Sequence, residues 1–141
     1  ERARGIVNFK SLGASGVPDT TDAYRDMGPL PFAVNLEVGS IQNDSLRQVL
    51  WTGAHLQLAL ISLPVKRTVP AEVHPDTDEM IYVTRGEAEV EIAGERYRAK
   101  EGCAVFIPAG KEHTVKNTAD RELKLFAVYA PPHHMRGERH P

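Results

Sequence analysis

Residues 72–79 read Glu-Val-His-Pro-Asp-Thr-Asp-Glu, and this stretch decides how the rest of the chain is interpreted. Residues two apart in a β-strand point to the same face, so we expect Glu72 and His74 to project together. A short turn through residues 75–76 would bring the next strand back, with Glu79 near its start. The pattern therefore predicts that these three side chains face one another.

A second informative stretch begins at Gly102. After five intervening residues comes Pro-Ala-Gly at 108–110, then His113 after two further residues and Asn117 after three more. A proline and a glycine in this arrangement shape a tight turn, which would deliver His113 at the beginning of a new strand. We expect Asn117 and the proline of the turn to have structural roles.

Short alternating runs indicate that the chain is built from β-strands. The clearest run, residues 87–93, alternates alanine, valine and isoleucine with three glutamates, which is the period of a half-buried strand. Residues 94–95 supply a turn, and residues 96–99 return with two arginines on the face that carries the glutamates. Helical periodicity is almost absent, so the sequence predicts an all-β antiparallel barrel or sandwich. The other expected strands are residues 47–51, 56–63, 80–84, 104–107, 114–116 and 122–129.

The composition is that of one ordinary globular domain. The chain has 141 residues, of which 41% are hydrophobic and 26% are charged, and its formal net charge is −2. This balance lacks the basic footprint of a nucleic-acid-binding protein. The most apolar stretch, residues 56–65, is far shorter than the ~20 residues that span a membrane. A single cysteine, Cys103, excludes an intramolecular disulfide, and we expect it to be a small buried apolar group.

The distribution of glycine and proline divides the chain into three parts. Residues 1–31 hold seven of these residues and are expected to form an irregular N-terminal arm, followed by a barrel over residues 32–130. The C-terminal tail, residues 131–141, is rich in proline, histidine and arginine and is expected to be loose. Its histidines, including His133 and His134, are interpreted as tail residues, with folding back over the barrel as the alternative. We expect a cytoplasmic location.

The two stretches together resemble the two sequence motifs of the cupin family. The second stretch matches the second cupin motif at all its defining positions. The first stretch matches the first motif at His74, Glu79 and Gly86, but it has Glu72 where cupins usually carry histidine. Fifteen residues separate the motifs, a short spacing that resembles small single-domain bacterial cupins. The resemblance implies an antiparallel jelly-roll barrel of the RmlC-like type.

The resemblance also implies a ligand set for one divalent metal ion. The proposed ligands are Glu72, His74, Glu79 and His113, and the ion would be Fe, Mn, Zn or Ni. Glu72 is either the fourth ligand or a catalytic general base. Two carboxylates would leave the charge of a bound dication near zero, so we expect this site to attract anions less than the usual cupin site does.

Two classes of function follow from this set. In the first, the chain is a metalloenzyme that acts on a small polar organic molecule, by dioxygenation or by isomerisation of the sugar-isomerase type. In the alternative, the barrel binds metal and a small-molecule ligand without turnover, as a sensor. We expect no nucleic-acid or membrane partner. A homodimer is expected because the barrel would otherwise expose edge strands, with the N-terminal arm crossing to the partner.

Overall fold

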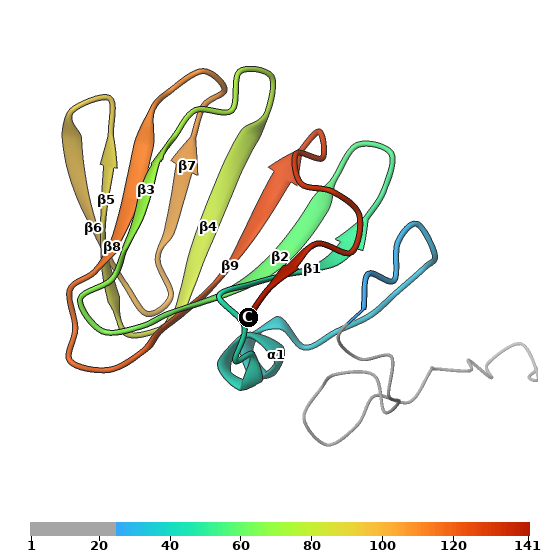
Figure 1. The fold of residues 1–141 in the computed structure, drawn as a ribbon, viewed down its shortest axis with the longest axis horizontal. Helices are drawn as coiled ribbons and strands as arrows, with labels where there is room; N and C mark the ends of the chain where they lie inside the picture. The colour runs from blue at the N-terminus through green and yellow to red at the C-terminus, as the bar shows by residue number, and fades with distance from the viewer. Residues whose placement is uncertain (1–24) are drawn as a thin grey trace, which may run out of the picture.

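A computed structural model of the chain describes residues 25–141, and Figure 1 shows its fold. One short helix precedes a series of antiparallel strands. The elements are α1 (Leu36–Gln42), β1 (Arg47–Thr52), β2 (Gln57–Leu63), β3 (Thr68–Glu72), β4 (Asp78–Arg85), β5 (Glu87–Ile92), β6 (Glu95–Lys100), β7 (Ala104–Ile107), β8 (His113–Asn117), β9 (Leu123–Ala130) and β10 (Arg139–His140).

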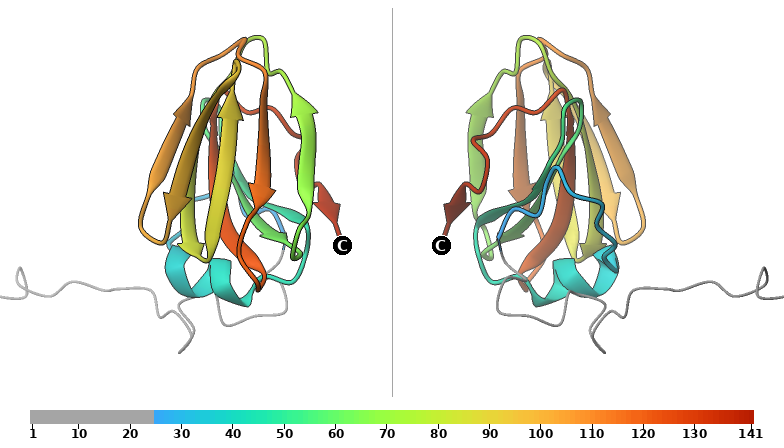
Figure 2. Two further views of the ribbon diagram at one scale, coloured as in Figure 1. Left: turned by 90° about the vertical axis from the view of Figure 1, so that its left-hand side faces the viewer. Right: turned by 90° about the vertical axis from the view of Figure 1, so that its right-hand side faces the viewer.

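The strands form two antiparallel sheets that face each other across the core. One sheet has the order β10-β1-β2-β9-β4-β7, and the other has the order β3-β8-β5-β6. In the side views of Figure 2 the sheets stand opposite each other, and α1 lies across one end of the barrel. The expected all-β antiparallel jelly roll is therefore confirmed.

The alternation seen in the sequence sets which side chains enter the barrel. In the β5–β6 hairpin Ala88, Val90 and Ala99 are fully buried, while the arginines of β6 pair with glutamates of β5 on the outer face. Arg98 Nε lies 3.0 Å from Glu87 Oε2, as expected for opposite charges across a hairpin. The inner faces of both sheets together bury one continuous aliphatic core.

Helix α1 was not expected, because seven residues are too few to show a helical period. Its N-cap is Asn35, whose Oδ1 accepts a hydrogen bond from the Val38 amide at 3.1 Å. At the other end the buried Lys124 Nζ, on β9, donates to the Asn43 carbonyl at 2.6 Å and to Ser62 Oγ at 2.9 Å. A buried lysine with these partners ties the helix end to the sheet.

Two expectations about mobility and burial are wrong. The tail is not loose, because β10 pairs with β1 in the larger sheet. Cys103 is exposed rather than buried, since it lies in the turn between β6 and β7. Residues 25–35 contain no helix or strand, as expected for the arm, and the rest of the arm lies outside the described residues. The division of the chain at residues 31 and 130 stays a prediction.

Within residues 25–141, no helix is long and apolar enough to cross a membrane. The cytoplasmic location stays a prediction.

The homodimer also stays a prediction. The strands at the sheet edges are β10 and β7 in the larger sheet and β3 and β6 in the smaller one, and the β7 side chain Phe106 is 72% exposed. Covering such edges lowers the exposure of unpaired backbone groups and apolar surface, so we expect a dimer in light scattering. A mass of 15.6 kDa across micromolar concentrations would show a monomer instead.

Asn117 has the structural role expected of it, and its replacement tests this role. Its Nδ2 donates to the carbonyls of Leu63, Pro64 and Arg121 at 2.9–3.2 Å, and its Oδ1 accepts from the Ala119 amide. Asn117→Ala leaves these buried groups without partners, so we expect a loss of roughly 2–3 kcal/mol in the free energy of unfolding.

Chemical denaturation measures this loss. Lys116→Ala is the matched control, because Lys116 is the neighbouring β8 residue and is exposed. We expect the control to change stability by less than about 0.5 kcal/mol. Equal stability of the two variants would contradict the structural role of Asn117.

Candidate metal centre

Three of the four predicted site residues lie at strand ends of the two sheets, and the fourth lies in a loop. Glu72 is the last residue of β3, Glu79 is the second of β4, and His113 is the first of β8. Glu72 and His113 are directly paired in the β3–β8 ladder. His74 lies in the loop beyond β3, where its carbonyl accepts a hydrogen bond from the Gly110 amide at 2.9 Å. This bond joins the loop of His74 to the turn that precedes His113, which begins β8 as the sequence predicted.

The structure brings all four side chains together. Glu79 Oε1 lies 3.2 Å from His113 Nε2 and 3.3 Å from His74 Nε2. Glu72 Oε1 lies 3.6 Å from His74 Nε2. The ligand-type atoms of Glu72, His74 and His113 all lie within 4.8 Å of one another. Two donors that share an ion at about 2.0–2.2 Å lie up to ~4.4 Å apart, so the spacing is close to that of a metal site.

A backbone contact fixes the orientation of the His113 ring. Its Nδ1 lies 3.0 Å from the Lys111 carbonyl. A carbonyl only accepts hydrogen bonds, so Nδ1 carries a proton, and in the neutral ring the lone pair of Nε2 is directed at Glu79 and His74. A metal-binding histidine usually has its second nitrogen held in this way.

Charge at the site is dominated by the buried Glu79. Burial raises the pKa of its carboxyl, but the neighbouring His113 and His74 outweigh burial and lower the pKa to about 2. Burial lowers the pKa of His113, but Glu79 and the Lys111 carbonyl outweigh it, and the net shift is upward. Glu79 is therefore an anion at neutral pH, with two imidazole nitrogens within 3.3 Å of its Oε1.

Several polar atoms of the site lack hydrogen-bond partners although they are buried. They are both ring nitrogens of His74 and Oε1 of Glu79. Buried polar atoms in folded proteins are nearly always satisfied, and leaving one without a partner costs about 1–3 kcal/mol. A cation bound between these atoms would satisfy the ring nitrogen and the carboxylate oxygen together, so the donor set fits a metal ion.

Sequence reasoning missed two polar residues beside these four. Arg47, on β1, has Nη2 3.8 Å from Glu72 Oε2 and Nη1 3.7 Å from Glu138 Oε2. Tyr129, on β9, is 1% exposed, and burial together with the charge of Glu79 raises the pKa of its phenol well above the ordinary value. The hydroxyl is therefore a neutral hydrogen-bond donor. The signal that could have found Arg47 is its position two residues before the buried Val49, which places both side chains on the inward face of β1.

The C-terminal segment closes over the site, as the alternative interpretation of its histidines predicted. The ring of His133 lies 3.9 Å from the ring of His74, centroid to centroid. Buried Gln57 holds the segment: its Oε1 accepts from the His133 and His134 amides at 3.0 and 2.8 Å, and its Nε2 donates to the His134 carbonyl at 2.8 Å. By contrast His55 is exposed in the turn between β1 and β2 and does not line the cavity.

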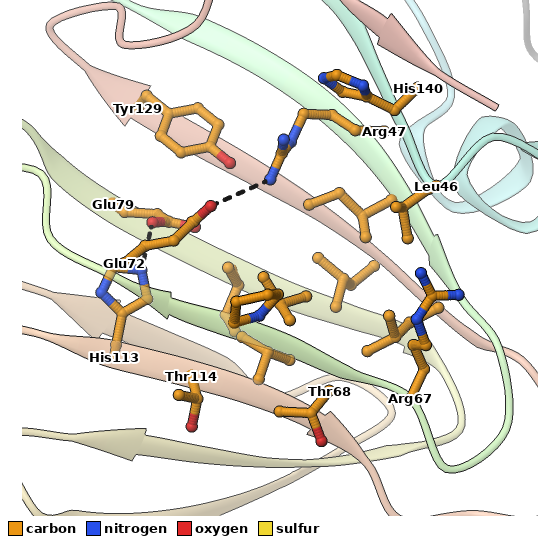
Figure 3. A pocket seen from close by; sticks show the side chains of 17 residues that line it. Leu46, Arg47, Arg67, Thr68, Glu72, Glu79, His113, Thr114, Tyr129 and His140 are labelled. Atoms are coloured by element: carbon orange, nitrogen blue, oxygen red, sulfur yellow. Dashed lines mark ion pairs between the residues drawn. The ribbon is translucent and has the colours of Figure 1, made fainter.

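A cavity of about 320 Å³ adjoins the cluster inside the barrel. Figure 3 shows Glu72, Glu79, His113 and Tyr129 on one side of it and Leu46 on the opposite side. Aliphatic side chains of both sheets line the space between. The volume lies at the small end of the ~300–1,000 Å³ range of ligand pockets.

Comparisons with known proteins agree with this architecture. A family model described as "Cupin domain" matches residues 59–129. The uncharacterized protein YrkC of Bacillus subtilis is 34% identical over 132 residues, which are 89% of this chain and 71% of YrkC. The crystal structure of BH2720 from Bacillus halodurans is 38% identical, with a TM-score of 0.81, and covers 82% of this chain and 92% of its own. The quercetin 2,3-dioxygenase of Bacillus subtilis is 36% identical over 70 residues, half of this chain and 21% of the dioxygenase.

Replacing Gln57 tests whether its hydrogen bonds hold the C-terminal segment in place. Gln57→Leu keeps the size of the side chain but removes its hydrogen bonds to His133 and His134. We expect amide hydrogen exchange over residues 131–141 to rise roughly tenfold or more. Gln48→Leu is the matched control, because Gln48 is equally buried on β1 and its side chain bonds only the Val49 carbonyl among the described residues. Equal exchange in both variants would contradict the role of Gln57.

Proposed function

Because the chain belongs to the cupin family, we propose that Glu72, His74, Glu79 and His113 hold one divalent metal ion, and that the chain is a metalloenzyme for a small organic molecule. The observation that carries the proposal is the convergence of two histidine Nε2 atoms on one buried carboxylate oxygen, at 3.2 and 3.3 Å. Two histidines with carboxylates suit Fe, Mn, Zn or Ni.

Each side chain has a part that follows from its surroundings. His74 and His113 would supply ring nitrogen ligands, and the low pKa of Glu79 keeps it ionised without help from the metal. Glu72 directs one oxygen towards His74 and the other towards Arg47. This position suits either a fourth ligand or a base that moves a proton at Glu72 Oε2, on the cavity side.

The chemistry is proposed to take place where the cluster meets the cavity. A bound divalent ion would polarise a substrate oxygen, and iron would also supply redox chemistry with dioxygen. The neutral Tyr129 hydroxyl lies at the same end and would donate a hydrogen bond to a substrate oxygen, while the aliphatic walls would contact the rest of the substrate. Similarity to a quercetin 2,3-dioxygenase over half of this chain supports dioxygenation ahead of isomerisation.

Metal identity is the measurement that separates the classes. We expect elemental analysis of the purified full-length chain to give about one divalent ion per chain, and mass spectrometry of the denatured protein to identify any small molecule that it released. Co-purified iron supports dioxygenation, whereas zinc or nickel supports isomerisation or binding without turnover. A chain that takes up none of the four metals contradicts the proposal.

Replacing the side-chain carboxylate of Glu72 by an amide, in Glu72→Gln, tests its role. If Glu72 is a ligand, Glu72→Gln weakens metal binding by about 10–100-fold or more, because it removes a charged donor. Glu72→His restores the usual cupin set and is expected to bind metal with a preference for softer ions. Isothermal titration with Zn²⁺ measures both. Glu89→Gln is the control, because Glu89 lies on the outer face of β5 and pairs with Arg96.

Full affinity in Glu72→Gln, together with loss of turnover, would instead make Glu72 the general base and leave a three-residue metal site. Glu79→Gln serves as the positive control, and we expect it to lose affinity in either case.

A further inference from the structure

We propose that the cavity binds a small monocarboxylate with a compact apolar body. Its carboxylate would lie at Arg47 and its body on the aliphatic wall. The inference rests on the proposed function, since it places this ligand beside the metal centre, and it replaces the sugar-type substrate expected from the sequence by a different chemical class.

The wall of the cavity is the first observation. Away from the four-residue cluster its lining is mainly aliphatic, with Arg67, Thr68, Thr114 and His140 as polar members at its margins. The aliphatic members include Leu46, Ile61, Leu63, Ile81, Val115 and Leu125. A sugar bound there would bury hydroxyl groups against methyl groups, and each unpaired hydroxyl costs about 1–3 kcal/mol. An alkyl or aryl body gains roughly 0.8 kcal/mol for each methylene that leaves water. The wall therefore selects against polyhydroxylated molecules.

The second observation is the incomplete hydrogen bonding of Arg47, which lines the same cavity. Its two ion pairs, at 3.7 and 3.8 Å, are longer than hydrogen bonds, and its buried Nε has no partner. A guanidinium presents a planar fork of N–H donors that matches a carboxylate. In Figure 3 the guanidinium reaches towards Glu72 beside the Tyr129 hydroxyl. Donors from two strands therefore meet where a ligand head would lie.

At the end of the cavity beside the metal centre, the net charge is compatible with an anionic ligand once a divalent metal ion is bound. Glu72 and Glu79 would balance the charge of the ion, which is why the sequence predicted weak attraction for anions. Arg47 adds a positive charge to the lining that this expectation did not include. Glu138 contacts Arg47 from outside the cavity and offsets part of this charge. Because little net positive charge is left at this end, we expect a head group with one negative charge to bind better than a dianion.

The size of the space limits the ligand further. A volume of about 320 Å³ corresponds to roughly ten water molecules at ~30 Å³ each. A short alkyl chain or one aromatic ring fits this volume together with its carboxylate.

A homologous series of fatty acids tests the apolar body. Acetate, butyrate, hexanoate and octanoate are titrated into the isotope-labelled full chain, with and without bound Zn²⁺, and binding is followed by NMR shifts of Val69 and Val115. We expect affinity to rise roughly fourfold per added methylene until the cavity is full. Gluconate, which matches hexanoate in carbon count and carboxylate, is expected to bind far more weakly. Equal affinity for gluconate and hexanoate would overturn the proposal.

Paired variants test the two halves of the site. Arg47→Gln is expected to lower the affinity for hexanoate roughly 10–100-fold and to leave 1-hexanol unchanged. Arg98→Gln removes the same charge from the outer face of β6 and is expected to have no effect. Val69→Thr, in the wall, should cost about fourfold, whereas Val128→Thr on the outer face of β9 should cost nothing. Hexanoate binding that is insensitive to both Arg47→Gln and Val69→Thr would show adventitious binding and overturn the proposal.

The failure of this inference is distinguishable from failure of the proposed metal site. If affinity rises with each methylene in a chain that binds no metal, the ligand class is supported and the proposed metal site is rejected. If the chain binds one metal ion but its affinity for the fatty acids does not change with their length, the metal site is supported and the ligand class is rejected.

Discussion

A carboxylate buried inside the barrel is the constraint on which the rest of this structure depends. Glu79 is 8% exposed and ionised, so positive or hydrogen-bonding groups must face it. They come from His113 on the opposite sheet and from His74 in a loop. The two sheets cannot shift against each other without separating these groups. The fold therefore holds the cluster, and the cluster in turn fixes how the sheets meet at this end.

The features that the sequence predicted well are those that depend on short spacing. Two motifs placed Glu72, His74, Glu79 and His113 close together, because turns of fixed chemistry determine where each strand begins. Alternation over residues 87–99 predicted the β5–β6 hairpin and its charged outer face for the same reason. Helix α1 and β10 were missed, since seven and two residues carry too little pattern to be recognised.

Features that depend on contacts between distant segments could not be predicted. Arg47 and Glu138 are far apart in sequence and meet only because β10 pairs with β1. The contact of His133 with His74 likewise depends on the Gln57 amide, whose partners nothing in the local sequence reveals. These are the contacts that give the polar end of the cavity its donors, so its chemical character emerges from the tertiary structure.

The position of β9 in the larger sheet has a consequence for synthesis of the chain. This strand follows β1 to β8 in the sequence, yet it lies between β2 and β4 and pairs with both along their length. Until residues 123–130 leave the ribosome, the sheet consists of two unjoined halves with exposed edges. Such long-range pairing is slow and leaves apolar edges open to aggregation. The larger sheet of the barrel is thus completed only once residues 123–130 are available to pair with β2 and β4.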